Sequence, residues 1–235
     1  MRLDQYLTKN CNIQSRNKAQ ELITANKIKI DGKIISKPSF KIEKEVTIEI
    51  LEEDFFVSRA AYKLKYFLDE LSIDLSKKEA LDIGSSTGGF TQILLNNNIR
   101  AVTCVDVGSN QLHDTLKDNK NITFFENTDI RNYNPNRSFD IVTCDVSFIS
   151  IHNILNDINR LANSEIIILF KPQFEVGVNV KRDKKGVVKD ARAIELARQK
   201  FLDATHQLHW ELNKSSMSKL QGKDGNNEEL FYFNK

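Results

Sequence analysis

Charged residues end two apolar runs in the second half of the chain. Asp145 ends one run and Lys171 ends the next. Since the carboxyl ends of parallel strands line the ligand crevice of an open α/β sheet, we expect both side chains to face that crevice. We expect Lys63 to reach the same place from a preceding helix and Glu228 to reach it from a C-terminal hairpin.

A set of two lysines and two acids suits the removal of a proton from a weakly acidic alcohol, such as a sugar hydroxyl. A buried lysine beside a second lysine can accept or polarise that proton. The carboxylates can hold the ammonium groups and the sugar in line for reaction. Glu229 is adjacent to Glu228, and the sequence leaves open which of the two glutamates faces the site.

A glycine-rich turn earlier in the chain predicts a nucleoside site. The stretch Ala80-Leu-Asp-Ile-Gly-Ser-Ser-Thr-Gly-Gly-Phe runs from an apolar strand into a helix, and its glycines let the backbone approach a ligand closely. Asp106 ends the next strand about 20 residues later, where a carboxylate can accept hydrogen bonds from ribose hydroxyls. Asp129 follows the third strand, where it could meet an adenine amino group. The expected cofactor-binding residues are Asp82, Gly84, Ser85, Ser86, Gly88, Gly89, Phe90, Asp106, Val107, Asp129 and Ile130.

The form of the turn favours S-adenosyl-L-methionine as the cofactor. Asp-x-Gly-x-x-x-Gly-Gly is typical of sites for this molecule, which has no pyrophosphate to bind, although the spacing alone leaves a dinucleotide open. Beside the lysine and acid set, such a cofactor predicts methyl transfer to a sugar hydroxyl. Enzymes that methylate base carbons use a cysteine in a Pro-Cys context, and those that methylate exocyclic amines use an Asn/Asp-Pro-Pro-Tyr/Phe turn. Neither motif stands in this sequence.

The elements that must position these residues follow from hydrophobic periodicity. Short apolar runs at 80–83, 101–105, 122–125, 141–145 and 166–171 alternate with helical or loop segments. This alternation predicts an α/β fold, a Rossmann-like doubly wound methyltransferase sheet with helices on both faces. Residues 58–71 carry apolar side chains at helical spacing, and residues 210–213 and 230–233 are expected to form a closing pair of strands.

The first 51 residues are predicted to form a small, separate α+β domain. Helices over 2–9 and 15–25 precede two strands around an Asp31-Gly32 hairpin signal, and a third strand is expected at 46–50. The predicted organisation is therefore a domain at 1–51, a linker at 52–57 and a catalytic domain at 58–235. The helices of the first domain carry Arg2, Lys9, Arg16 and Lys18 at polar positions, where these side chains could meet phosphates.

Charge is distributed unevenly along the chain. The formal net charge is only +2, but residues 1–50 hold ten Lys and Arg against six Asp and Glu, and residues 171–192 hold seven against three. Two local basic surfaces on a nearly neutral protein suit a polyanion held at two places. The expected RNA-binding residues of the catalytic domain are Arg59, Lys181, Arg182, Lys184 and Lys185.

Composition disfavours other protein classes. No apolar stretch approaches the roughly 18 to 20 residues that a bilayer span needs, and no apolar signal core follows Met1, so we expect a cytoplasmic protein with no membrane partner. Three cysteines and four histidines lie at spacings unlike those of metal ligands, so no metal is expected. We expect a monomer.

The N-terminal stretch resembles the RNA-binding module of a small-subunit ribosomal protein, a module that also occurs in RNA-modifying enzymes. The residues that carry this resemblance are Met1-Arg-Leu-Asp, Ser15-Arg16, Ala19, Lys29-Ile-Asp-Gly and Lys37-Pro38. The resemblance covers about 50 residues and implies contact with structured RNA.

The whole chain resembles the TlyA, or haemolysin-A-like, family of ribosomal RNA 2′-O-methyltransferases, which are relatives of FtsJ. The motifs that carry this resemblance run from end to end and occur in the family's order: Val57-Ser-Arg-Ala-Ala-Tyr-Lys-Leu, Asp82-Ile-Gly-Ser-Ser-Thr-Gly-Gly-Phe, Asp106-Val-Gly, Asp145-Val-Ser-Phe-Ile-Ser, Lys171-Pro-Gln-Phe-Glu, Gly186-Val-Val-Lys-Asp and Gly225-Asn-Asn-Glu.

This resemblance implies a catalytic tetrad of Lys63, Asp145, Lys171 and Glu228, and a cytidine ribose of ribosomal RNA within a ribosomal subunit as substrate. The sequence departs from the family pattern at Ala60-Ala61, where a glycine pair is expected, and at Ser109-Asn110, where the turn usually contains glycine. The alternative function is that of a non-catalytic ribosome-assembly or RNA-binding factor that retains S-adenosyl-L-methionine binding. The sequence does not indicate which nucleotide or which ribosomal subunit is modified.

Overall fold

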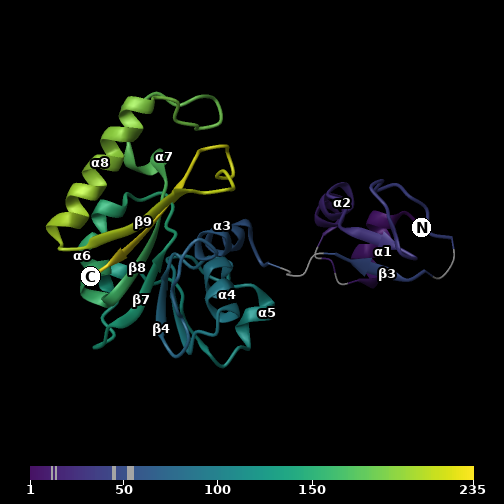
Figure 1. Ribbon diagram of the computed structural model, residues 1–235, viewed down its shortest axis with the longest axis horizontal. Helices are drawn as coiled ribbons and strands as arrows, with labels where there is room; N and C mark the ends of the chain where they lie inside the picture. The colour runs from purple at the N-terminus through teal and green to yellow at the C-terminus, as the bar shows by residue number, and fades with distance from the viewer. Residues whose placement is uncertain (12, 14, 44–45, 52–55) are drawn as a thin grey trace. The chain divides into compact units, whose positions relative to one another are not determined.

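The chain folds into two compact units, Met1–Phe55 and Phe56–Lys235. The computed structural model describes all residues except 12, 14, 44–45 and 52–55 (Figure 1). Residues 52–55 of the predicted linker therefore lie outside the described residues. Its last two residues, Phe56 and Val57, are buried within the second unit.

Two helices form one layer of the N-terminal unit. They are α1 (Leu3–Asn10) and α2 (Arg16–Thr24), and they pack against each other. Ser15 begins α2 as its N-cap, since its side-chain oxygen accepts a hydrogen bond from the Lys18 amide at 3.2 Å. The buried core joins both helices to the sheet and consists of Leu3, Leu7, Ile13, Ala19, Leu22, Ile23, Ile28, Ile30 and Ile42.

A three-stranded antiparallel sheet forms the other layer of this unit. Strand β1 (Ile28–Ile30) lies between β2 (Lys33–Ile34) and β3 (Ile48–Ile50). Asp31 and Gly32 join β1 to β2 with φ angles of 48° and 79°. A two-residue type I′ turn requires positive φ at both central positions, so the predicted hairpin is confirmed.

The second unit contains a seven-stranded sheet in the order β6-β5-β4-β7-β8-β10-β9. The five parallel strands are β4 (Glu79–Ile83), β5 (Ala101–Val105), β6 (Ile122–Phe125), β7 (Phe139–Cys144) and β8 (Ala162–Phe170). The C-terminal hairpin of β9 (Glu211–Met217) and β10 (Glu229–Asn234) adds two antiparallel strands beside β8. The chain runs from β4 outward to β6 and then crosses to β7, so the strand order reverses at β4. Ligand crevices of open α/β sheets form at such a reversal.

Helices cover both faces of this sheet (Figure 1). On one face, α3 (Arg59–Leu68) and α4 (Gly89–Asn96) pack on a core that includes Leu64, Phe67 and Ile93. On the other face, α6 (Leu155–Leu161) and α8 (Ala191–Gln207) pack on a core that includes Phe201 and Phe231. The predicted doubly wound architecture is therefore confirmed. The remaining short elements are α5 (Asp114–Lys117), α7 (Pro172–Glu175) and the 3₁₀ turns η1 (Ile130–Asn132) and η2 (Ile151–Asn153).

Strand β8 begins at Ala162, four residues before the predicted start. Ala162 pairs with Phe139 of β7, and the Ser164 carbonyl accepts a hydrogen bond from the Lys235 amide at 2.8 Å. These backbone contacts extend the strand through polar residues that an apolar pattern does not mark. Within the described residues, no helix is long and apolar enough to cross a membrane.

Candidate active site

The glycine-rich turn brings the ends of β4 and β7 into close contact. Gly84 has a φ of 74°, and a Cβ atom there would lie 3.1 Å from the carbonyl oxygen of Asp145. Its amide donates to the Val105 carbonyl at 2.9 Å. A residue with a side chain would push these strand ends apart. Glycine at this position therefore allows the turn to lie directly beside a predicted catalytic aspartate.

Two adjoining cavities open at these strand ends, with volumes of about 300 Å³ and about 160 Å³. Gly84, Ser86, Asp145 and Ser147 line both of them. Of the eleven predicted cofactor-binding residues, nine line one or both cavities. The larger cavity contains Asp106, Val107, Asp129 and Ile130, the smaller contains Ser85, Gly89 and Phe90, and Gly84 and Ser86 belong to both.

Asp106 organises the wall of the larger cavity. One carboxylate oxygen accepts from the Ser86 amide at 2.8 Å, and the other accepts from the Gly108 amide at 2.7 Å. The side chain thus fixes the turns after β4 and β5. A carboxylate can accept about four hydrogen bonds, so Asp106 retains acceptor capacity for a ligand in the cavity.

Asp129 already has a partner within the structure. Arg131 contacts both of its carboxylate oxygens, with a closest distance of 2.5 Å. These hydrogen bonds lower the pKa of the Asp129 carboxyl from its ordinary value. Asp129 lines the cavity as an ionised, oriented acceptor.

The other two predicted cofactor-binding residues, Asp82 and Gly88, line neither cavity. The Asp82 carboxylate is fully buried and accepts hydrogen bonds from Thr91 at 2.6 Å and from Thr143 at 2.8 Å. Burial raises the pKa of this carboxyl to about 6. Gly88 has a φ of 89° and begins α4, where a side chain would collide with Leu116. Both residues support the shape of the turn.

The four predicted catalytic residues form two ion pairs, of which Lys63–Glu228 is buried and Lys171–Asp145 is largely buried. The Lys171 ammonium lies 2.5 Å from an Asp145 carboxylate oxygen, and the Lys63 ammonium lies 2.5 Å from a Glu228 carboxylate oxygen. The Lys171 ammonium also donates to the Ser147 hydroxyl at 2.9 Å. Burial raises the pKa of the Asp145 carboxyl, and the nearby Lys171 opposes that rise.

The glutamate that faces the site is Glu228. Its neighbour Glu229 points to α8, where it accepts hydrogen bonds from Arg198 at 2.8 and 2.9 Å. Successive residues of a strand point to opposite faces, so only one of the two can meet Lys63. Gln173 also donates to Glu228, at 3.4 Å.

Comparisons with known proteins agree with this geometry. Residues 56–235 match the FtsJ-like methyltransferase family, and residues 1–48 match the S4 domain. The chain is 47% identical to the 23S rRNA (cytidine-2′-O)-methyltransferase TlyA of Campylobacter jejuni, over 99% of each protein. It is 33% identical to the 16S/23S rRNA (cytidine-2′-O)-methyltransferase TlyA of Mycobacterium tuberculosis, over 97% of this chain and 87% of that protein. A solved structure described as a putative hemolysin from Streptococcus thermophilus aligns with a TM-score of 0.73 and 27% identity, covering 100% of this chain and 88% of that one.

The chain belongs to the TlyA branch of the FtsJ-like methyltransferase family. Its two departures from the family pattern fit the structure. Ala61 is fully buried in α3, and Ala60 lines the smaller cavity. Asn110 adopts a φ of 52°, a left-handed conformation that asparagine tolerates better than most residues.

Sequence reasoning missed Ser58, which lines the smaller cavity of the methyltransferase unit. Ser58 is the N-cap residue of α3, but its side chain makes no capping hydrogen bond. Its hydroxyl oxygen is buried without a hydrogen-bond partner among the described residues, as is the hydroxyl oxygen of Ser85 in the same cavity. A serine before a helix usually indicates a cap, so the sequence carried no signal for this second role.

Phe148 is a second residue that the sequence reasoning missed. Its side chain is 92% exposed, lines the mouth of the larger cavity and lies 5.4 Å from the Phe174 ring, centroid to centroid. Its φ is 67°, which is uncommon for a bulky residue. Phe148 is therefore an exposed residue with a strained backbone, in the same cavity wall as the predicted catalytic residue Asp145.

The predicted RNA-binding residues of the methyltransferase unit divide into two groups. Lys181, Lys184 and Lys185 are exposed, as expected for residues that meet phosphates. Arg182 instead donates to the backbone carbonyls of Gln173, Gly177 and Val180, so it holds its own loop in shape. Arg59 donates to the Gln221 carbonyl at 2.9 Å while remaining exposed.

In the N-terminal unit, Lys9 is exposed, and Lys18 lies 4.0 Å from Glu21. Arg2 and Arg16 both contact the buried Asp4. This arrangement could not be read from the spacing of the charged residues, because it joins two helices.

Proposed function

We propose that this chain is an S-adenosyl-L-methionine-dependent methyltransferase that modifies the 2′-hydroxyl of a cytidine in ribosomal RNA within a ribosomal subunit. The observation that carries the proposal is the pair of ion pairs Lys171–Asp145 and Lys63–Glu228, beside a cavity built on a glycine-rich turn. The two TlyA relatives are named for this reaction.

The cavities offer hydrogen-bonding groups that the proposed cofactor would need. Asp106 retains carboxylate acceptor capacity in the larger cavity, where ribose hydroxyls would need it, and Asp129 lines the same cavity with its carboxylate held by Arg131. The unpartnered hydroxyls of Ser58 and Ser85 offer donors in the smaller cavity, where the methionine carboxylate would need them. Unpartnered buried polar atoms are costly, so a ligand that pairs with them is favoured.

Methyl transfer requires a deprotonated or strongly polarised hydroxyl in line with the methyl group. When bound, the cofactor supplies an electrophilic methyl group on a sulfonium. Lys171 lines the smaller cavity beside Asp145, which lines both cavities. Its ammonium would first pass a proton to Asp145, and the neutral amine would then accept the proton of the attacking hydroxyl. Asp145 and Ser147 fix the position of that amine. Lys63 and Glu228 would hold the ribose by hydrogen bonds and balance the local charge.

The mouth of the site suits an unpaired nucleotide. An exposed aromatic ring such as Phe148 can stack on a base that has left its helix, and bases in loops are the usual targets of RNA recognition. Lys181, Lys184 and Lys185 provide positive charge for phosphates on the same unit.

Methyl transfer to ribosomal subunits tests this proposal. Subunits from cells that lack the protein would be incubated with purified protein and radiolabelled S-adenosyl-L-methionine, and digested RNA would be analysed by mass spectrometry. We expect label in 2′-O-methylcytidine, with the large subunit as the preferred substrate because the relative with 47% identity is named for 23S rRNA. Cofactor and RNA binding without any transfer would instead support the non-catalytic assembly factor, and a methylated base would contradict the assigned chemistry.

A further inference from the structure

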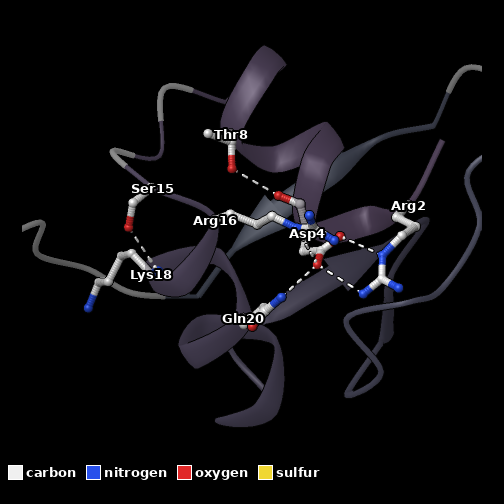
Figure 2. A network of polar contacts seen from close by, with 7 residues as sticks. All are labelled: Arg2, Asp4, Thr8, Ser15, Arg16, Lys18 and Gln20. Atoms are coloured by element: carbon white, nitrogen blue, oxygen red, sulfur yellow. Dashed lines mark hydrogen bonds and ion pairs between the residues drawn. The ribbon is translucent and has the colours of Figure 1, made fainter.

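The N-terminal unit contains a fully buried carboxylate surrounded by four hydrogen-bond contacts. Asp4 of α1 has no exposed surface, although carboxylates are rarely buried completely. Arg2 donates to both of its oxygens, at 3.1 and 3.0 Å (Figure 2). From α2, Arg16 donates at 3.0 Å and Gln20 at 2.8 Å. Three of these four hydrogen bonds end on one Asp4 oxygen, Oδ2, and the fourth ends on Oδ1.

The two arginines differ from Asp4 in their exposure. Their side chains are 42% and 49% exposed for Arg2 and Arg16, while the Asp4 side chain is 0% exposed. Each guanidinium has five N–H donors. Among the described residues, Arg2 uses two of them on Asp4 and Arg16 uses one, so three and four donors on these partly exposed groups make no hydrogen bond within the described part of the chain.

The geometry also holds the guanidinium groups close together. One nitrogen of Arg2 and one of Arg16 each lie 3.0 Å from the same Asp4 oxygen, so these two nitrogens are at most about 6 Å apart. Two like charges at this distance repel unless an anion lies between them. Asp4 supplies that anion beneath the surface, and the cluster retains one net positive charge above it.

We propose that Asp4 is a positioning residue that fixes Arg2 and Arg16 as a preformed clamp for one RNA phosphate. Planar guanidinium groups bind phosphate through paired N–H donors, and affinity rises when their orientation is set before binding. Gln20 completes the support by occupying an Asp4 oxygen. This inference rests on the proposed function, which supplies RNA as the ligand of the clamp.

Substitution of Asp4 by asparagine separates positioning from simple charge. Asp4→Asn removes a negative charge from a surface that binds a polyanion, so long-range electrostatics alone predicts tighter binding. Loss of the clamp predicts weaker binding, by about tenfold, since charged hydrogen bonds to phosphate lose their geometry. The two explanations therefore predict changes of opposite sign.

Glu49→Gln provides the matched control in the same unit. Glu49 is an acid on β3 that lies 3.6 Å from Lys29, outside the clamp. This variant should bind RNA as tightly as the unchanged protein or slightly more tightly. Binding of full-length protein to unmodified ribosomal subunits would be measured by filter retention over a range of salt concentrations, with cofactor affinity and thermal unfolding measured in parallel.

Arg2→Lys and Arg16→Lys keep the inference testable if Asp4→Asn unfolds the unit. Each retains the positive charge and leaves one arginine on Asp4. We expect each to weaken binding and to make the dependence of log K on log salt shallower by up to about one, as loss of one phosphate contact would. Unchanged affinity in both folded lysine variants, or tighter binding by folded Asp4→Asn, would overturn the clamp. Weakened binding by these variants in a protein that transfers no methyl group would refute the proposed function and leave the clamp standing.

Discussion

Ser58→Ala should weaken cofactor binding without destabilising the fold. Ser58 occupies the N-cap position of α3 but makes no capping hydrogen bond, so its removal costs the helix no cap. Its hydroxyl is buried, lines the smaller cavity and has no partner among the described residues. We place the methionine carboxylate of the cofactor there, because Asp106 and Asp129 in the larger cavity suit the adenosine.

The magnitude follows from the type of hydrogen bond that would be lost. A hydrogen bond to a charged group contributes about 1.5 to 3 kcal/mol, which corresponds to roughly tenfold to hundredfold in affinity. Titration calorimetry with S-adenosylhomocysteine should show this loss. Binding of 5′-methylthioadenosine, which lacks the carboxylate and the amino group, should be unchanged.

Ser15→Ala serves as the matched control for this prediction. Ser15 does cap α2, through the Lys18 amide, so its loss should destabilise the N-terminal unit by about 1 kcal/mol and leave cofactor affinity unchanged. Equal losses for both ligands with Ser58→Ala, or no loss for either in a folded protein, would refute the assignment of Ser58 to the carboxylate.

Three further substitutions test other parts of the site. Asp106→Ala should reduce cofactor affinity by roughly tenfold to hundredfold in a folded protein, and calorimetry showing unchanged affinity would remove Asp106 from the site. Phe148→Ala should raise KM for ribosomal subunits by about tenfold with kcat largely retained, because the 92% exposed ring can stack on a base but contributes little to the core. Unchanged KM and kcat would contradict a role of Phe148 in stacking on the substrate. Burial raises the pKa of Asp82 to about 6, so between about pH 4 and pH 6 the folded unit keeps a proton that the unfolded chain releases. The free energy of unfolding should therefore fall as pH rises from about 4 to about 6. Asp82→Asn should remove this change in the free energy of unfolding between about pH 4 and pH 6, which is on the order of 3 kcal/mol. Calorimetric melts that show the same pH dependence in both proteins would contradict the raised pKa of Asp82.

Periodicity in the sequence predicted the elements that carry the site. Parallel strands end at one edge of the sheet, so the residues after two apolar runs, Asp145 and Lys171, had to lie near each other. The same logic could not decide between Glu228 and Glu229, because strand register sets which face each residue occupies. The structure resolves this choice through the contact of Glu229 with Arg198.

Hydrogen bonds that form only in the folded chain account for what the sequence could not predict. Asp82 ends a strand beside the glycine-rich turn, but its carboxylate points to Thr91 and Thr143 under that turn. Arg182 stands in a basic run but donates to three backbone carbonyls of its own segment. In both cases the residue type and spacing were compatible with ligand binding, and a tertiary partner determined the role.

Single-turnover methylation of ribosomal subunits by Lys171 variants tests the central claim most directly. Lys171→Ala should bind cofactor and subunits normally but lose about a hundredfold to ten-thousandfold in the rate of methyl transfer, the contribution of general-base catalysis. Lys171→Arg should not restore the rate, because a guanidinium stays charged and cannot accept a proton. Near-normal transfer by Lys171→Arg alone would show that Lys171 contributes its positive charge and does not act as the base. Near-normal transfer by Lys171→Ala would contradict the assignment of the catalytic group.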